Sequence, residues 1–558
     1  MTAIRTPLTR DGQLSDEVEL YHRTYTTLLR SSGETLLRVL ESAHRTMGSS
    51  LHPLAGSPEP DLGAFIYATR RLPDVIGDAR VIVMGQEAEA LGVTPDWTRL
   101  EAPARRRHWY ASGDGRLAVL LASTSDLDDV IPTLVAYQIE WNKLRARLRA
   151  LGSVPGDAAA AAEALGGTPE DWARLDQTWD GRLAERLGKV AGQRLNLRVQ
   201  LLGGSEVGYA RMTRRWWKPV QDELGADQLD DRPLYFVSSN SHSLVNVLTG
   251  WARAHEDEIR GWVTAAAPPV LRDELARFET GEAEGSWENF LYYAARGFYD
   301  SQPDGSLWDR RREYERRIGV RHLSSRTALR VSAQVIDLAR LDPDGLDPRI
   351  ADADREKLAR STARIVNIEY PLGLAAYNIL REVAVSTAGL RGVYVLGKAA
   401  TLNADVGDVM ISSVVHDEHS GNTYWLDNVF TFQDIQPWLR FGSGLDNQRA
   451  VTVKSTFLQN REYLDFYYRE AFTVVEMEAG PFCNAIYEIT EADRHPTDES
   501  VNFSKLPIDF GMIHYASDTP YTQARTLGAQ GLDYYGMDST YASTVAIVRR
   551  ILAREGIV

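Results

Sequence analysis

Two glutamates stand at the end of a short apolar stretch, TVVEMEAGPFCNA, which spans residues 473–485. The apolar residues predict a buried strand that runs into a helix. Side chains in a strand alternate between two faces, so we expect Glu476 and Glu478 to share one face and Met477 to lie on the other. Two carboxylates on one face of a buried strand are costly unless a partner receives them. The pattern therefore predicts either a polar ligand or a structural partner at this strand end.

Two further predicted strands end in residues that could bind or react. Residues 393–412 read VYVLGKAATLNADVGDVMIS and include Lys398, one of only seven lysines, and residues 512–520 read MIHYASDTP. A carboxylate can act as a general acid, and a lysine can hold an anionic group as a point charge. Ligands of parallel α/β sheets bind at the carboxyl ends of the strands, so we expect these groups to face one site.

The composition is that of an ordinary globular protein, with 558 residues, 44% of them hydrophobic and 25% charged. The net charge of −15 argues against a nucleic-acid polymer or an anionic membrane as partner. The sequence shows no apolar N-terminal segment and no apolar run of roughly 18 residues, which argues against secretion and a membrane span. The single cysteine, Cys483, excludes an intrachain disulfide and favours a cytoplasmic protein.

The chain divides into regions of different pattern. Residues 1–151 combine short strands with helices, which predicts an N-terminal α+β or mostly helical domain of unknown role. Residues 152–231 begin with a glycine- and alanine-rich stretch and are expected to form a connecting helical region. From residue 232 to 558 strands alternate with helices, which predicts an α/β domain with a mixed, mainly parallel sheet flanked by helices. Residues 252–325, approximately, are expected to form a helical insertion in that domain.

Several motifs after residue 232 resemble those of the purine and uridine phosphorylase superfamily. The family's glycine turn followed by Gly-Asp and an apolar strand matches residues 397–412, its ribose-binding Met-Glu pair matches Met477-Glu478, and its late Ser-Asp pair matches Ser517-Asp518. Within the superfamily the chain most resembles AMP nucleosidases, through YFVSSNSHSLVNVLTGWA, VNIEYPLGLAAYNILREVA and SDTPYTQARTLGAQGLDYYGMDSTYASTVAIVRRILAREG. The resemblance spans about residues 232–555 without the insertion, and it implies a nucleoside-phosphorylase-like fold there.

The resemblance implies an enzyme that breaks the bond between ribose and a base. Asp518 resembles the family's acid, which donates a proton to N7 of a purine, and Glu478 resembles the carboxylate that accepts hydrogen bonds from the ribose 2′ and 3′ hydroxyl groups. Departure of the base builds positive charge on the sugar, which a carboxylate stabilises. Other expected substrate contacts are Met477, Ser517, Gly397, Lys398, Glu476, Asn240, Glu369, Phe457 and Gln459.

Two of these residues have an equally simple structural interpretation. Glu476 could instead be the partner of an arginine or of a backbone amide. Phe457, expected near the purine together with Gln459, is at least as well interpreted as a core residue.

Departures from the family decide the expected nucleophile. Phosphorylases bind phosphate with a glycine and an arginine after their first strand, where this chain has SSNSHS at residues 238–243. They also have a serine or threonine where this chain has Lys398, which could contact a substrate phosphate or pair with a buried carboxylate. We therefore expect water as the nucleophile, a nucleotide or nucleoside as substrate, and neither a metal nor an organic cofactor. Glu369 and His242 are the candidate bases.

Two alternatives stay open: a phosphorylase that binds phosphate in an altered way, and a nucleotide-sensing protein that binds without cleaving. The resemblance also implies a homo-oligomer. HDEH at residues 416–419 is interpreted as a solvated turn rather than as a metal site. RRR at 105–107 and RRREYERR at 310–317 are interpreted as solvated faces, with subunit contacts or phosphate binding as the alternatives.

Overall fold

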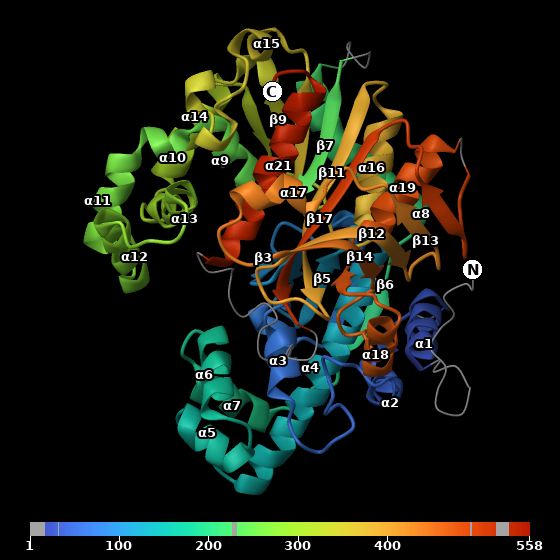
Figure 1. Ribbon diagram of the computed structural model, residues 1–558. Helices are drawn as coiled ribbons and strands as arrows, with labels where there is room; N and C mark the ends of the chain where they lie inside the picture. The colour runs from blue at the N-terminus through green and yellow to red at the C-terminus, as the bar shows by residue number, and fades with distance from the viewer. Residues whose placement is uncertain (1–16, 32, 226–231, 492–493, 520–534) are drawn as a thin grey trace.

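The computed structural model describes residues 17–31, 33–225, 232–491, 494–519 and 535–558. These residues form two β-sheets with helices packed around them (Figure 1). Part of the third motif that resembles AMP nucleosidases, residues 520–534, lies outside the described residues.

The first sheet comes from the N-terminal region and has six strands in the order β1-β6-β2-β5-β4-β3. β6 lies in the predicted connecting region and pairs in parallel with β2, so residues 152–231 contribute a strand to this sheet. The strands are β1 (Thr35–Leu36), β2 (Val81–Gly85), β3 (Thr98–Ala102), β4 (Arg105–Ala111), β5 (Arg116–Leu120) and β6 (Arg198–Leu201). The helices are α1 (Glu17–Ser31), α2 (Glu41–Thr46), α3 (Leu62–Thr69), α4 (Thr124–Leu151), α5 (Ala158–Leu165), α6 (Pro169–Thr178), α7 (Leu183–Gly192) and α8 (Glu206–Leu224).

The passage from β5 into α4 has a local cause in the sequence. β5 is the apolar run RLAVL, and Ser123 after it forms a capping box with Asp126, in which each side chain receives the other residue's backbone N–H. Asp126 Oδ2 also accepts a hydrogen bond from the Ala122 N–H at 2.6 Å. The acidic residues SDLDD at the start of α4 are thereby fixed next to the end of β5.

The second sheet has eleven strands in the order β16-β13-β12-β14-β15-β11-β7-β10-β9-β8, with β17 paired to β11 and β12. Six of its eleven strand pairings are parallel, so the sheet is mixed. The strands are β7 (Leu234–Ser239), β8 (Val320–Leu323), β9 (Ala333–Asp337), β10 (Arg364–Glu369), β11 (Leu390–Thr401), β12 (Val409–Asp417), β13 (Thr423–Leu426), β14 (Gly444–Thr452), β15 (Val474–Glu476), β16 (Ser500–Phe503) and β17 (Asp509–Asp518).

Helices cover both faces of the second sheet, because apolar side chains of its central strands point to both faces. On β11, Val393 and Val395 pack into the core under α16 (Ala375–Val385) and α19 (Ala479–Thr490). Tyr394 and Leu396, one position along, pack into the opposite core under α9 (Ser243–Thr249) and α21 (Asp538–Arg554). The remaining helices of this part are α15 (Arg355–Arg360), α17 (Phe432–Ile435) and α18 (Arg461–Arg469).

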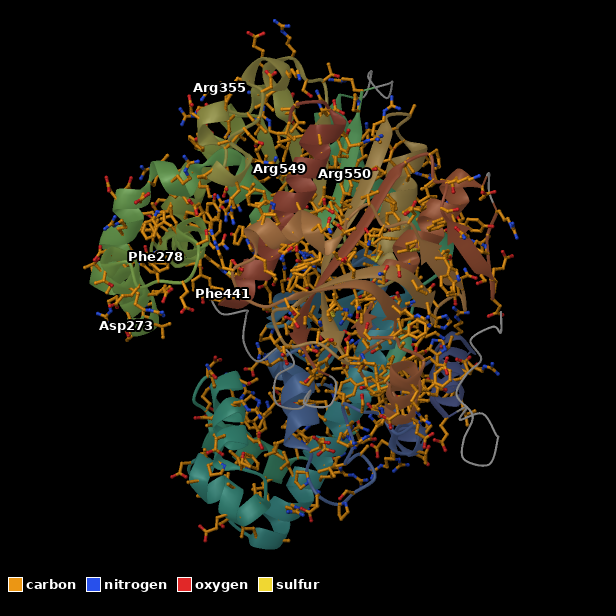
Figure 2. The ribbon with its side chains drawn as sticks, viewed as in Figure 1. Asp273, Phe278, Arg355, Phe441, Arg549 and Arg550 are labelled. Atoms are coloured by element: carbon orange, nitrogen blue, oxygen red, sulfur yellow. The ribbon has the colours of Figure 1, made fainter. Side chains whose placement is uncertain are left out.

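The predicted insertion is helical. It comprises α10 (Trp251–Ala254), α11 (Glu256–Ala266), α12 (Pro269–Thr280), α13 (Trp287–Asp300) and α14 (Ser306–Arg317), and the chain then returns to the sheet through β8. Figure 2 places Asp273 and Phe278, both on α12, at the outer side of the molecule. Among the described helices none combines the length and the apolar character that a membrane span requires.

Candidate functional site

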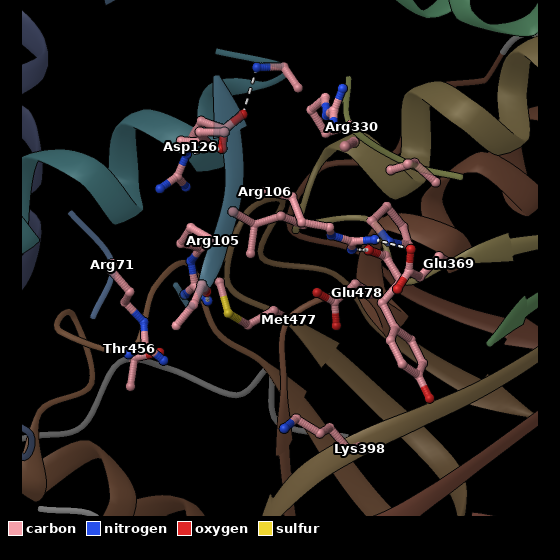
Figure 3. Close-up of a pocket in the computed structure, with 18 of the residues that line it drawn as sticks. Arg71, Arg105, Arg106, Asp126, Arg330, Glu369, Lys398, Thr456, Met477 and Glu478 are labelled. Carbon is pink, nitrogen blue, oxygen red and sulfur yellow. Dashed lines mark hydrogen bonds and ion pairs between the residues drawn. The ribbon is translucent and has the colours of Figure 1, made fainter. Parts of the chain in front are cut away.

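A cavity of about 910 Å³ lies between the two sheets and brings most of the predicted site residues together (Figure 3). One wall is formed by the ends of β10, β11, β15 and β17. The opposite wall comes from the N-terminal region, namely the end of α3 with the residues after it, β3, β4 and the start of α4. The predicted residues that line the cavity are Glu369, Gly397, Lys398, Gln459, Glu476, Met477, Glu478, Ser517 and Asp518.

The strand register explains why residues far apart in the sequence converge. β11 and β17 are parallel neighbours, with Lys398 opposite Tyr515 and Ala400 opposite Asp518, on either side of a bulge. β15 pairs with β11 from the other side, with Val475 opposite Ala400. The ends of these three strands therefore deliver a lysine and carboxylates to one edge of the sheet.

Glu476 ends β15 and caps the helix that follows. Its Oε2 accepts hydrogen bonds from the N–H groups of Glu478 and Ala479, each at 2.6 Å, where α19 begins. Its Oε1 accepts one from the Thr452 hydroxyl, whose oxygen accepts the Gly480 N–H at 2.7 Å. These contacts agree with the structural interpretation of Glu476. The strand stops before Glu478, so the expectation that the two glutamates share a strand face is wrong.

Glu478 flanks the start of α19 and projects its carboxyl group into the cavity (Figure 3). Burial raises the pKa of this carboxyl to about 8, the Glu476 carboxyl acts in the same direction, and Arg105 opposes them. Burial likewise raises the pKa of Glu476 to about 7. Glu478 is therefore largely protonated at neutral pH, and a ligand that donates hydrogen bonds to it would favour the ionised form.

Asp518 ends β17 and is only 8% exposed. The Ser517 hydroxyl donates to its Oδ2 at 3.2 Å, whereas Oδ1 is buried without a hydrogen-bond partner among the described residues. Burial raises the pKa of Asp518, and the nearby Lys398 opposes that shift. A carboxyl with a raised pKa at a cavity wall is suited to donate a proton to a ligand.

Lys398 is accessible within the cavity, at the bulge of β11. It forms no ion pair with any residue that the structure describes, so the alternative of a buried carboxylate partner is not met there. Desolvation by the cavity walls lowers its pKa, while Asp518 opposes the shift.

The N-terminal wall is rich in arginines, and the interpretation of residues 105–107 as a solvated face is wrong. Arg105 donates to both oxygens of Asp129, from Nε at 2.9 Å and from Nη2 at 2.8 Å. Arg107 donates to Asp126 at 2.5 Å and to Asp129 at 2.7 Å. The two arginines hold the pKa of Asp129 well below its usual range although burial opposes this. Two sequence features could have indicated these ion pairs. Arg105 and Arg107 stand at alternate positions of the strand RRRHWYA and so share one face, and the start of α4, SDLDD, is acidic.

Arg106 points away from that pair and contacts the other wall. Its Nη1 lies 2.7 Å from Oε2 of Glu369, and its Nη2 donates to the Tyr370 carbonyl. Figure 3 shows this ion pair across the cavity. Glu369 thus has a charge partner, which leaves it less suited to accept a proton from water.

Three residues named from the sequence do not line the cavity. Phe457 is 1% exposed and packs edge-on against Tyr67, with ring centroids 5.2 Å apart, so it belongs to the core. Asn240 accepts the N–H groups of His242 and Ser243 at the start of α9, and it is used as a helix cap. His242 lies beside the Tyr541 hydroxyl at 3.3 Å, and burial lowers its pKa to about 3.

His416 and Asp417 of the HDEH segment are buried, and Glu418 and His419 are half-buried, so the interpretation as a solvated turn is wrong. Asp417 is fully buried and lies 2.8 Å from His419 Nδ1. It also accepts hydrogen bonds from the Ser420 hydroxyl and the Asn484 amide, at 2.7 and 2.8 Å. Within the described ranges no group of three or more His, Cys, Asp or Glu side chains is arranged to hold a metal ion. The segment thus fixes α19 to the sheet.

The fold and the site define a mixed α/β protein with one cavity walled by carboxylates on one side and by arginines on the other. The chain belongs to the family of unknown function DUF6909, whose model matches residues 37–553. A search of curated proteins found no match.

Solved structures that resemble the chain include two kinds of enzyme. The 5′-methylthioadenosine/S-adenosylhomocysteine nucleosidase from Neisseria meningitidis is 14% identical, with 42% of this chain and 93% of that chain covered and a TM-score of 0.28. Uridine phosphorylase from Schistosoma mansoni is 9% identical, with 61% and 93% covered and a TM-score of 0.29.

Proposed function

We propose that the protein hydrolyses the N-ribosyl bond of a purine nucleotide or nucleoside. The observation that carries this proposal is the convergence of Glu478, Asp518 and Lys398 at one cavity. Glu478 and Asp518 were selected from the sequence by motifs that resemble those of the purine and uridine phosphorylase superfamily, and Lys398 was selected because it departs from that pattern. Convergence was not required by the sequence, because the three residues lie on different elements up to 120 positions apart.

In the proposed reaction the bond between C1′ of the ribose and the base nitrogen breaks, and its electron pair moves to the base. Asp518 donates its proton to the base as the bond breaks. Ionised Glu478 accepts hydrogen bonds from the 2′ and 3′ hydroxyl groups and stabilises the positive charge that develops on the sugar. A water oxygen then bonds to C1′, and the proton that it releases restores Asp518.

The electrostatics of the two carboxyls support these roles. Burial raises the pKa of Asp518, which favours the protonated form that an acid needs. Glu478 has a raised pKa in the free protein, but hydroxyl donors from a bound ribose and the nearby Arg105 would both favour its ionised form. Substrate binding would therefore help to create the charge that the reaction uses.

A phosphorylase is the second candidate, because Lys398 lines the cavity and forms no ion pair within the described part of the chain, so it can receive an anion there. Inorganic phosphate would then attack C1′ in place of water and give ribose 1-phosphate. The nucleophile is decided by incubating the protein with AMP, adenosine and uridine, each with and without phosphate, and identifying the base and the sugar by chromatography. Free base with ribose 5-phosphate, independent of added phosphate, is the expected result for AMP.

The role of Asp518 is tested with Asp518→Asn, which keeps the shape of the side chain but cannot donate the same proton. We expect turnover to fall by about 100-fold or more. Asp273→Asn is a matched control, since Asp273 is exposed on α12 and does not line the cavity. Near-normal turnover of Asp518→Asn would discard the acid role. Tight nucleotide binding without turnover by the unmodified chain would favour the sensing function instead.

A further inference from the structure

One buried arginine on the N-terminal wall of the cavity has no counter-ion among the described residues. This residue, Arg71, lies just after the end of α3 and lines the cavity. Arg105 and Arg107, which line the same cavity, pair with aspartates of α4. No described carboxylate lies within ion-pair distance of Arg71, although the chain has 77 acidic residues. A buried cation without a counter-ion is costly, so its presence here calls for an explanation.

The contacts of Arg71 fix its side chain without neutralising its charge. Its Cζ lies 3.3 Å from the centre of the Tyr67 ring, and its Nη1 donates to the Tyr67 carbonyl at 3.1 Å. This carbonyl belongs to the last turn of α3, so the bond caps the helix and occupies a single N–H of the guanidinium. The Tyr67 ring is itself fixed in the core, edge-on against Phe457. Arg71 is therefore held in one orientation before a ligand arrives.

The other donors of this guanidinium have no acceptor in the described part of the chain. Nε is buried without a hydrogen-bond partner there, and Nη2 donates to no described residue. The side chain belongs to a residue that is only 6% exposed. Burial lowers the pKa of Arg71 to about 10, so the group keeps its charge at neutral pH. An enclosed and fixed cation with unused donors at a cavity wall is suited to bind an anionic group.

The remaining cations that line the cavity without an ion pair to a described residue differ from Arg71 in burial. Arg296 and Lys398 are exposed, and Arg330 is half-buried, so water can solvate these three charges. Of the four, only Arg71 is buried. A purely structural role, in which Arg71 caps α3, explains one hydrogen bond and leaves the buried charge without a reason.

The cavity that Arg71 lines also contains Glu478 and Asp518, the carboxyls assigned above to the ribose and to the base. Its volume of about 910 Å³ is near the upper end of the range of about 300–1,000 Å³ for small-molecule sites, so a base, a ribose and a phosphate group fit together. A phosphate group offers a guanidinium several charged acceptor oxygens. A nucleotide brings such a group with its ribose, whereas a nucleoside leaves Arg71 without an anion.

We propose that Arg71 binds the phosphate group of the substrate and that the protein therefore prefers a nucleotide to the corresponding nucleoside. That the bound nucleotide is also the substrate rests on the proposed function, whereas the need for an anionic group rests on the burial and the contacts of Arg71. The N-terminal region then supplies the residue that selects the substrate, and the C-terminal wall supplies the groups that act on it.

Calorimetry on the full-length chain tests the proposal, with Asp518→Asn as the background so that cleavage does not interfere. The probes are two matched pairs, AMP with adenosine and UMP with uridine, so that the result does not depend on one base. We expect a nucleotide to bind about 10-fold or more tightly than its nucleoside, because of its hydrogen bonds to a charged group. Arg71→Met should remove this advantage by weakening the nucleotide and leaving the nucleoside unchanged.

Two further variants separate phosphate binding from a structural role. Arg71→Lys keeps the charge but loses the planar group that lies on Tyr67, and it should retain part of the nucleotide advantage. Arg360→Met is the matched control, because Arg360 is exposed on α15 and does not line the cavity. Circular dichroism and the melting temperature show that each variant is folded, and Arg71→Gln replaces Arg71→Met if the latter is not.

Three results would overturn the proposal. The first is equal affinity for nucleotide and nucleoside in both pairs. The second is no binding of any of the four probes. The third is an Arg71→Met variant that either behaves like the control or loses affinity for nucleotide and nucleoside alike, as a merely structural role predicts.

Inorganic phosphate is the other source of such an anion. Titration of adenosine and uridine in the presence of millimolar phosphate distinguishes the two sources. Tighter nucleoside binding with phosphate, lost in Arg71→Met, together with no advantage of the nucleotide, would assign Arg71 to inorganic phosphate and overturn the preference for a nucleotide. Since binding needs no turnover, a nucleotide advantage that depends on Arg71 in a chain that releases no base would refute only the hydrolase proposal.

Discussion

The two walls of the cavity differ in how they lower the free-energy cost of buried ionisable groups. On the C-terminal wall, burial raises the pKa values of Glu476, Glu478 and Asp518, so these carboxyls can avoid the cost of a buried charge by holding a proton. On the N-terminal wall the arginines keep their charge, and Asp126 and Asp129 compensate Arg105 and Arg107. The first wall is suited to proton transfer, and the second to holding an anion.

The contrast is sharpest between Arg105 and Arg71, which line the same cavity. Arg105 has a bidentate aspartate partner, whereas Arg71 has an aromatic ring and a carbonyl but no ion pair among the described residues. Removing the partner of the first should cost folding stability. Removing the second should cost ligand affinity and little stability.

The largest effect is expected from Asp129→Ala. Asp129 is fully enclosed and accepts hydrogen bonds from both Arg105 and Arg107, so its loss leaves Arg105 without its counter-ion and leaves Arg107 with Asp126 alone. We expect a loss of about 3–5 kcal/mol in the free energy of unfolding. Urea denaturation measures it, with Arg71→Met as the comparison, which should lose no more than about 2 kcal/mol. Equal losses in the two variants would erase the distinction between paired and unpaired arginines.

The next largest effect is expected from a substitution on the C-terminal wall of the cavity. Glu478→Gln keeps the shape of the side chain but cannot ionise, and we expect kcat/KM to fall by about 100-fold on the best substrate. In the unmodified protein kcat/KM should rise with pH up to about 8, because ionised Glu478 is the active form. Asp273→Asn is the control, because Asp273 is exposed on α12 and does not line the cavity. A pH profile that is flat between 6 and 8 would argue against a role for ionised Glu478.

The smallest effect is the pH dependence of stability. The folded-state pKa values of Glu476 and Glu478 are about 7 and 8, above the ordinary value of 4.5. Between pH 4.5 and pH 8 the native state therefore binds more protons than the unfolded state. Stability therefore falls as pH rises through this range. Glu478→Gln removes one of the two groups and should be more stable than the unmodified protein at pH 8 by about 1 kcal/mol. Denaturation curves at pH 5 and pH 8 that shift equally in both proteins would contradict this.

The chemistry at the strand ends could be predicted from the sequence because it depends on local patterns. An apolar run that stops at Glu476 and another that stops at Asp518 mark the carboxyl ends of strands, whichever strands lie beside them. Motif resemblance then named Glu478 and Ser517, and a departure from the family pattern named Lys398. All three line the cavity. The helical insertion followed in the same way from its charged and aromatic composition.

Other assignments failed where two roles share one local pattern. Phe457 and Asn240 sit next to strand ends just as ligand contacts do, but one completes a core and the other caps a helix. The arginines of β4 look like a solvated run until the aspartates of α4 are placed against them. In each case the deciding partner is distant in the sequence.

The sequence by itself determined the strand ends, the residue types at them and the capping box that starts α4, because hydrophobic periodicity and caps act within a few residues. Only the tertiary structure decided that the N-terminal region forms one wall of the cavity, which arginines are paired, and that Glu476 caps α19 beside Glu478, whose pKa burial raises. The physical reason is that burial and charge pairing depend on which segments pack together.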